Sequence, residues 1–141
     1  MEISRRTDYA CRILIELASR PDGGRVSARE LATLIGVQHP FARRIVTQMA
    51  AAGLVDTRRG AHGGVGLARR ANTITLNDVI VVMEGGVSLN LCVRDPSACE
   101  RSPRCPVHTV WNNTGRIVIQ YLDDCTIGDL AALAAAEADA R

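Results

Sequence analysis

The fold is decided by residues 27–67, which read SARELATLIGVQHPFARRIVTQMAAAGLVDTRRGAHGGVGL. Ser27 and Glu30 have the spacing of a capping box, in which a serine hydroxyl and a glutamate carboxylate satisfy free backbone amides at the start of a helix. This spacing predicts a helix from about Ala28 to Ile35. Gly36 then predicts a turn, because glycine adopts the left-handed conformation that other residues resist.

A second helical segment and two short strands follow this turn. The apolar residues of the helical segment recur at helical spacing; they are Phe41, Ile45, Val46 and Met49. Two helices joined by a short glycine-containing turn are typical of a helix-turn-helix. Residues 54–57 and 65–67 have strand character, and residues 58–64 between them have turn character. We therefore expect a mainly α fold with a small β-wing, a winged helix-turn-helix.

Further helices are predicted on both sides of this unit. The first covers residues 8–19, with Thr7 as its N-cap, and a short helix over residues 74–84 is capped by Thr75. Residues 85–106 have loop character. A long helix with an apolar face covers residues 107–122. A last helix begins at the capping box formed by Thr126 and Asp129.

Charge is distributed unevenly along the chain, although the net formal charge is only +2. Residues 1–70 contain 12 arginines and 6 acidic residues, whereas residues 71–141 contain 5 arginines and 9 acidic residues. The first half therefore carries +6 and the second half −4. A basic half is the electrostatic footprint of a nucleic-acid-binding unit, because contacts to phosphate supply most of the affinity. A basic face that is only solvated is the alternative.

Basic and polar side chains occupy the two places where a winged helix meets DNA. Recognition helices present residues near their N-terminal end to the base edges of the major groove, where arginine pairs with guanine and glutamine with adenine. Arginines in the turn of the wing suit a narrow minor groove. The candidate DNA-binding residues are Gln38, His39, Arg43 and Arg44 on the helix and Arg58 and Arg59 in the wing. For each of them, solvation of an outer face is the alternative.

Five cysteines are many for 141 residues, and their odd number argues against a closed disulfide framework. Three of them form the pattern Cys92-x6-Cys99-x5-Cys105-x2-His108. Thiolates are the usual ligands of iron-sulfur clusters, and histidine is an established substitute. Zinc accepts the same set of three cysteines and a histidine, so the spacing alone leaves a structural zinc site open. We expect the other two cysteines to be inert packing residues.

Several short motifs resemble one family of regulators, and the resemblance runs from about residue 3 to residue 133. The motifs are Gly36-Val37, Phe41, Ile45, Met49, Ala52-Gly53-Leu54-Val55, Arg59-Gly60 and Gly63-Gly64-Val65-x-Leu67, followed by the cysteine pattern. They are similar to the winged-helix regulators typified by the iron-sulfur cluster assembly regulator (IscR) and the nitric-oxide-sensitive repressor (NsrR). The sequence departs from this pattern at Gln38, where such proteins commonly have a capping serine. Pro40 suits the first turn of that helix.

The resemblance implies a homodimer that binds double-stranded promoter DNA. It also implies that Cys92, Cys99 and Cys105 hold an iron-sulfur cluster. The organisation we expect is a DNA-binding domain (1–84), a cysteine-rich loop that binds the cluster (85–106), and a long dimerisation helix with a C-terminal helix (107–141).

Two residues match family positions for the fourth ligand of the cluster. His108 matches the histidine of the assembly regulator, which carries a 2Fe-2S cluster. Asp8 matches the aspartate of nitric-oxide-sensing members, which carry a 4Fe-4S cluster and receive this ligand from the partner subunit. We favour Asp8 and 4Fe-4S, because a ligand from the partner's DNA-binding domain would couple the state of the cluster to DNA affinity. A carboxylate favoured near a helix N-terminus is the alternative for Asp8, and a polar residue in the first turn of a helix is the alternative for His108.

The function we expect is transcriptional regulation that depends on the cluster and senses nitric oxide, redox state or iron and cluster status. The alternatives are a winged-helix regulator with structural zinc or a thiol switch, and an iron-sulfur redox protein. An enzyme is not expected, because no nucleophile, base and orienting group stand at a recognisable spacing. No segment approaches the roughly 18 apolar residues that span a membrane, and no signal peptide is evident, so we expect a cytoplasmic protein.

Overall fold

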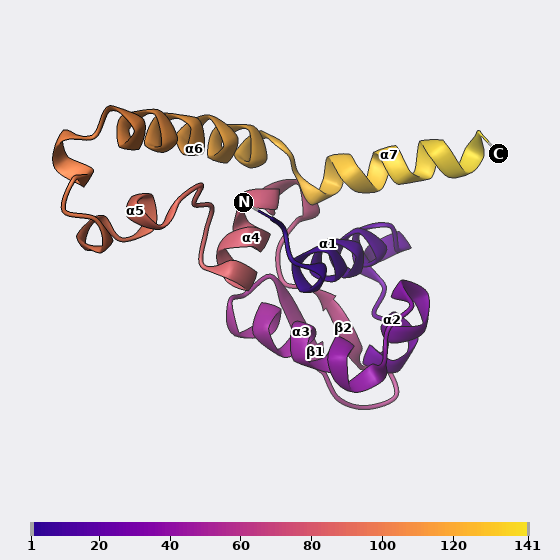
Figure 1. Ribbon diagram of the computed structural model, residues 1–141. Coiled ribbons are helices and arrows are strands. Elements are labelled where there is room, and N and C mark those ends of the chain that lie inside the picture. The colour runs from indigo at the N-terminus through magenta and orange to yellow at the C-terminus, as the bar shows by residue number, and fades with distance from the viewer. Residues whose placement is uncertain (1, 141) are drawn as a thin grey trace.

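The computed structural model describes residues 2–140 (Figure 1). Its helices and strands, in chain order, are α1 (Arg5–Ala18), α2 (Ala28–Ile35), α3 (His39–Ala51), β1 (Val55–Arg58), β2 (Gly64–Leu67), α4 (Leu76–Glu84), α5 (Leu91–Arg94), α6 (Pro106–Asp124) and α7 (Ile127–Asp139). Short 3₁₀ turns lie at Pro21–Gly23, Ala71–Thr73, Pro96–Ala98 and Ser102–Arg104.

The first part of the chain is a winged helix-turn-helix, as the sequence predicts. β1 and β2 pair antiparallel, with Val55 opposite Leu67 and Arg58 opposite Gly64. Helices α1 to α4 surround one apolar core, to which the base of the wing contributes Val65. The fully buried side chains of this core include Ile13, Leu14, Leu31, Ile45, Met49, Leu54, Ile74 and Ile127. The predicted fold class, mainly α with a small β-wing, is confirmed.

The helices begin where the sequence predicts, except α1. Ser27 caps α2 by accepting a hydrogen bond from the Glu30 amide at 3.1 Å, and Gly36 ends it in the left-handed conformation with φ of 73°. The prediction that Thr7 caps the first helix is wrong, because Ser4 is the N-cap and Thr7 is fully buried. The turn of helix before residue 8 is therefore ordered by side-chain contacts that apolar periodicity does not reveal.

The base of the wing is fastened by one ion pair. The Arg25 guanidinium donates to both carboxylate oxygens of Asp56, at 2.6 and 2.7 Å, and to the Gly64 carbonyl at 2.9 Å. Val26 also exchanges two backbone hydrogen bonds with Val65, at 2.8 and 3.0 Å. A two-stranded sheet is marginal by itself. These contacts fix the wing to the segment that enters α2.

The last two helices run end to end along the upper side of the molecule (Figure 1). α6 continues without a break through residues 112–115, where the sequence includes a glycine, because one glycine in a long helix costs only about 1 kcal/mol. At the junction the Leu76 amide donates to the Cys125 carbonyl, and the Ile127 amide donates to the Ile74 carbonyl, both at 2.9 Å. Ile127 and Leu130 then pack α7 against the winged-helix core. The predicted capping box of Thr126 and Asp129 begins this helix.

α6 exposes a row of large apolar side chains. The exposed residues are Val107, Val110, Trp111, Ile117 and Tyr121, and the last two leave 68% and 70% of their surface accessible. Such an exposed apolar surface is typical of a face that a partner covers, in keeping with the predicted dimerisation helix. None of the helices within residues 2–140 has the length and apolar character needed to cross a membrane.

Candidate nucleic-acid interface and cysteine loop

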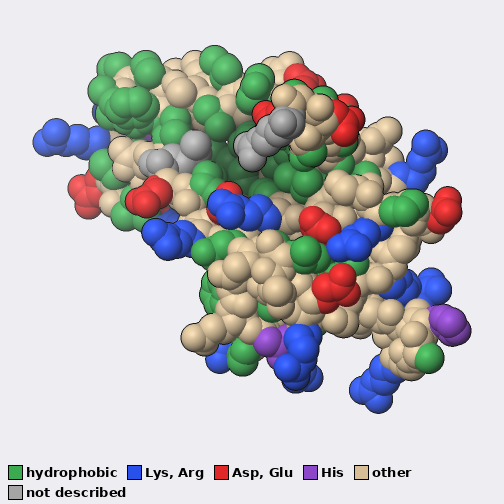
Figure 2. All heavy atoms as spheres, turned by 90° about the vertical axis from the view of Figure 1, so that its right-hand side faces the viewer, with side chains coloured by type: hydrophobic (Ala, Val, Ile, Leu, Met, Phe, Trp, Pro, Cys, Tyr) green, Lys and Arg blue, Asp and Glu red, His purple; other side chains and the backbone are tan. Residues whose placement is uncertain are grey.

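The recognition helix and the tip of the wing project at the same end of the molecule. Figure 2 shows two groups of basic and histidine side chains projecting there, and in Figure 1 this lower end contains α3, α2 and the turn of the wing. The sequence places histidine and arginine at the start of α3 and again in the wing turn. A major groove and a neighbouring minor groove can be contacted together by such a pair of projections.

The structure presents most of the predicted DNA-binding side chains to solvent. Gln38, Arg43, Arg44 and Arg59 are exposed, and His39 is half-buried at the first position of α3. Arg43, Arg44 and Arg59 make no ion pair within residues 2–140, so their charges are available to a nucleic acid. Arg58 lies 3.5 Å from the Asp56 carboxylate. A shallow depression of about 530 Å³ follows the outer face of α3 beside His39, Arg43 and Arg44.

The start of the recognition helix is built without a side-chain cap. Gln38 occupies the N-cap position in an extended conformation and its side chain makes no capping hydrogen bond, while Pro40 lies in the first turn. The Phe41 and Ala42 amides donate to the Gln38 carbonyl at 3.0 and 3.1 Å. The Gln38 side chain is therefore free to reach a base edge instead of holding the helix end.

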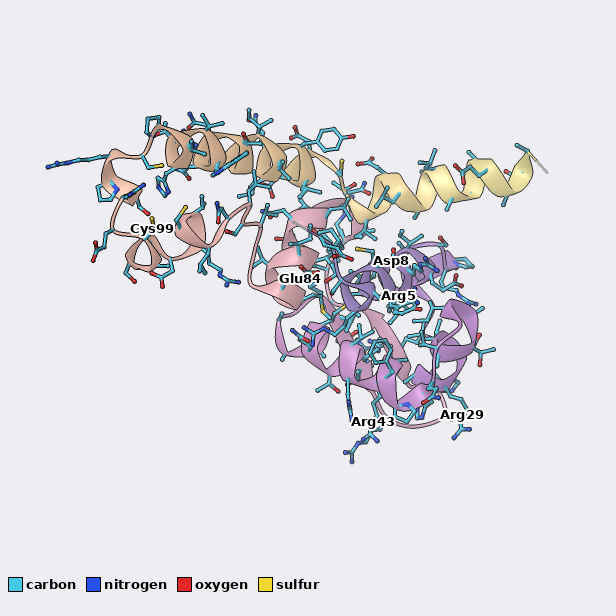
Figure 3. The ribbon with its side chains drawn as sticks, viewed as in Figure 1. Arg5, Asp8, Arg29, Arg43, Glu84 and Cys99 are labelled. Carbon is cyan, nitrogen blue, oxygen red and sulfur yellow. The ribbon has the colours of Figure 1, made fainter. Side chains whose placement is uncertain are left out.

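Arg29 is a basic residue of this surface that the sequence prediction omitted. It is exposed in the first turn of α2, and Figure 3 shows it projecting from the same end of the molecule as Arg43. Its position at the N-terminus of a helix that precedes the recognition helix suits a contact with the phosphate backbone. The signal in the sequence was an arginine two residues after the capping residue Ser27, outside the helix on which base readout is expected.

The cysteine loop (residues 85–106) lies between α4 and α6, away from the winged-helix core (Figure 1). It contains a short helix, α5, and two 3₁₀ turns that the sequence prediction of a plain loop did not include. Cys92 is on α5, Cys99 follows the first of these turns and Cys105 is the N-cap of α6. Cys92 and Cys105 are half-buried and Cys99 is exposed.

The structure brings two of the predicted ligands together. The Cys92 sulfur lies 3.5 Å from Nδ1 of His108, across the contact between α5 and the first turn of α6. Within residues 2–140 no three His, Cys, Asp or Glu side chains converge closely enough to hold a metal ion. The Cys92–His108 pair shares its loop with Cys99 and Cys105. In the single chain these two cysteines do not come close enough to the pair to form a metal site.

One buried serine lies between two of the loop cysteines in the chain. Ser102 is only 5% exposed and is the one buried side chain of residues 85–106, all of which the structure describes. Its hydroxyl oxygen has no hydrogen-bond partner within residues 2–140. A buried hydroxyl left unpaired costs about 1–3 kcal/mol. Three thiols and one buried, unpaired hydroxyl within one loop are residue types that fit an iron-sulfur cluster.

Asp8 lies on α1, far along the molecule from Cys99 in the single chain (Figure 3). Its carboxylate forms an ion pair with Arg12 at 2.8 Å, and both side chains are about half exposed. The Arg12 guanidinium also lies 5.6 Å from the centre of the Tyr9 ring, and the edge of that ring contacts Phe41 of α3. Asp8 is thus exposed on one side and connected through aromatic packing to the recognition helix on the other.

Glu84, at the end of α4, holds the start of α1. One of its carboxylate oxygens accepts hydrogen bonds from the Thr7 hydroxyl at 2.5 Å and from the Ser4 amide at 2.9 Å. The hydrogen bond from Thr7 is the main reason that the pKa of Glu84 lies below its usual value. A carboxyl with a lowered pKa stabilises the fold at neutral pH, and that contribution disappears as the pH falls through the lowered value.

We therefore expect Glu84→Gln to lower the free energy of unfolding by about 1 kcal/mol at pH 7, since the carboxylate is mostly exposed and its hydrogen bonds are partly screened. The difference in stability between the variant and the parent protein should begin to shrink as the pH falls into the usual range of a glutamate pKa, and it should be smallest once the pH has passed the lowered pKa of Glu84. Urea unfolding at pH 7 and at several lower pH values measures both quantities. A difference in stability that does not depend on pH would contradict this assignment.

The remaining two cysteines lie outside these sites. Cys11 packs against the core on α1, and burial, assisted by the charge of Asp8, raises the pKa of its thiol to about 11. It is therefore protonated at neutral pH, as expected of a packing residue. Cys125 is half-buried at the end of α6.

Comparisons with known proteins agree with this architecture. A family model described as Rrf2, iron-dependent transcriptional regulator, matches residues 3–133. The structure of CymR, the global cysteine regulator of B. subtilis, is similar with a TM-score of 0.77 and 31% identity, and the match covers 94% of this chain and 98% of that one. IscR of T. potens is similar with a TM-score of 0.75 and 26% identity, covering 95% of this chain and 88% of that one.

An oxidised form of Staphylococcus aureus CymR is similar as well, with a TM-score of 0.72 and 26% identity over 93% of this chain and 96% of that one. The predicted resemblance to winged-helix regulators typified by IscR is therefore confirmed. The wing, the recognition helix and the family match over residues 3–133 all indicate the same family. This chain belongs to the Rrf2 family of winged-helix, DNA-binding transcriptional regulators.

Proposed function

We propose that this regulator binds promoter DNA as a homodimer and that an iron-sulfur cluster held by Cys92, Cys99 and Cys105 controls its affinity. The observation that carries the proposal is the loop itself: three cysteines within 14 residues, an unpaired buried hydroxyl between two of them, and a histidine against the first. When bound, the cluster supplies iron that responds to nitric oxide, to redox state or to iron availability.

The chain's own residues would provide the coupling between the cluster and DNA. Asp8 is exposed and its only charged contact within residues 2–140 is Arg12, so it is free to act as the fourth ligand in a second copy of the chain. Through Arg12 and Tyr9 it connects to Phe41, whose ring centre lies 5.8 Å from that of Tyr9, at the start of the recognition helix. Engagement or release of Asp8 would therefore change the position of α3, and two recognition helices must dock together on half-sites about 34–36 Å apart.

His108 is the competing fourth ligand, and its 3.5 Å contact with Cys92 favours it within one chain. A cysteine and a histidine in contact also suit zinc, so a winged-helix regulator with structural zinc is the second candidate function. The two ligands predict different clusters. We favour Asp8 and 4Fe-4S because Asp8 connects to the recognition helix through Arg12 and the Tyr9–Phe41 contact.

Metal and sulfide analysis of protein purified without oxygen tests the proposal. We expect a coloured protein with about four iron and four sulfide per subunit, in keeping with Asp8 as the fourth ligand. About two of each would replace this with a 2Fe-2S cluster and His108. A colourless protein with zinc and without sulfide would contradict the cluster and leave only the DNA-binding regulator.

A further inference from the structure

Ser102 differs from the other serines of the cysteine loop. Ser97 donates its hydroxyl hydrogen bond to the Asp95 carboxylate at 2.6 Å, and Ser88 donates to the Asn90 carbonyl at 2.8 Å. Both of these serines are more accessible than Ser102, and each hydroxyl has a partner two residues away within the loop. Ser102 alone is buried, and its hydroxyl is unpaired within residues 2–140. The local structure of the loop therefore does not account for the hydroxyl.

The backbone of Ser102 connects two of the predicted cluster ligands. Its amide donates to the Cys99 carbonyl at 3.0 Å, and its carbonyl accepts from the Cys105 amide at 3.4 Å. These hydrogen bonds form the 3₁₀ turn that determines the spacing of the two cysteines. Ser102 therefore lies on the short turn that joins Cys99 to Cys105, in a segment whose other side chains face outward or are only partly buried.

We propose that Ser102 is a positioning residue of the cluster site, whose hydroxyl donates a hydrogen bond to sulfur when the loop holds its cluster. This inference rests on the proposed function. A buried hydroxyl without a partner is unfavourable, and sulfur atoms of a cluster or of its cysteine ligands accept hydrogen bonds from such donors. Hydrogen bonds to these sulfurs stabilise the reduced cluster and raise its reduction potential. Ser102 would therefore determine both how firmly the loop retains the cluster and the potential at which the cluster is reduced.

Three variants of the full-length protein test this role: Ser102→Ala removes the hydroxyl, Ser102→Thr keeps it, and Ser97→Ala is the matched control in the same loop. We expect Ser102→Ala to lose its cluster to a chelator about 10-fold faster or more, the usual effect of removing a partner that supports a metal ligand. Its midpoint reduction potential should also be lower than that of the parent protein. Ser102→Thr and Ser97→Ala should match the parent protein in both measurements.

In the cluster-free proteins, the thermal unfolding midpoint distinguishes a role in holding the cluster from a role in the structure of the loop. Without the cluster, Ser102→Ala removes a buried unpaired hydroxyl, so its thermal unfolding midpoint should equal or exceed that of the parent protein. A serine needed only for the structure of the loop would instead lower this midpoint, and that result would overturn the proposal. An unchanged potential and an unchanged rate of cluster loss in Ser102→Ala would overturn it as well.

The same preparations separate this inference from the function on which it rests. Iron and sulfide in the parent protein, with no difference between Ser102→Ala and Ser97→Ala, would reject the role of Ser102 and leave the proposed function intact. A parent protein that has neither iron nor sulfide after purification without oxygen would reject both.

Discussion

Replacing Arg43 and Arg44 by alanine is expected to abolish specific DNA binding while leaving the fold intact. Both side chains are exposed on the outer face of α3, and neither forms an ion pair within residues 2–140. An arginine that bonds a guanine edge contributes about 1–3 kcal/mol, so each substitution should weaken binding by roughly 5- to 150-fold. The core residues of α3, which include Ile45 and Met49, point to the opposite side and are unaffected.

Fluorescence anisotropy on a fragment selected from genomic DNA by the parent protein measures this loss. The dependence of affinity on salt should become shallower by about one unit for each lost phosphate contact and should stay unchanged for a lost base contact. Arg116→Ala is the matched control, because it removes one exposed arginine from α6, at the end of the molecule away from α3 (Figure 1). If Arg43→Ala and Arg116→Ala weaken binding equally, α3 is not the recognition helix.

Replacing Cys92 by alanine is expected to remove the cluster entirely, which is the largest effect predicted for the cysteine loop. The content should fall from about four iron per subunit to almost none, because a cluster bound through three cysteines loses one of its protein ligands. The substitution also removes the 3.5 Å contact with His108. The winged-helix core contains none of the three loop cysteines, so its folding should be preserved.

Cys125→Ala is the control for this variant. Cys125 is a half-buried cysteine like Cys92, but it lies at the junction of α6 and α7, outside the loop. It should keep the full iron and sulfide content. Equal iron content in Cys92→Ala and the parent protein would remove Cys92 from the ligand set and would leave the cysteine pattern without its functional interpretation.

Local signals in the sequence were sufficient for most of the fold. The boxes formed by Thr75 with Asp78 and by Thr126 with Asp129 are present as predicted, because each depends on residues three positions apart. The start of α1 was misplaced because Thr7 contacts Glu84, a residue 77 positions away, and becomes buried. The short helix α5 was not predicted, because four residues are too few for apolar periodicity to be visible.

For the DNA-binding surface and the cysteine loop, the sequence predicts which residue types take part but not how they are arranged in space. Arginines at the start of α3 and in the wing follow from the position of the helix-turn-helix, whereas Arg29 depends on how α2 is oriented against α3. The cysteine pattern and the resemblance to the family together predict the candidate ligands. Neither could show that Ser102 becomes buried, since a serine flanked by arginine and proline in a loop is usually exposed.

In the proposed function, a cluster in the cysteine loop controls DNA affinity at α3 of the same molecule. The most direct test is to measure the Kd of the same preparation for its selected DNA fragment before and after the cluster is removed by a chelator without oxygen. We predict a change in affinity of at least about 5-fold, the lower end of measured couplings between sites, and no such change in Cys92→Ala. Equal affinities of the cluster-bound and cluster-free protein would show that the cluster does not control DNA binding.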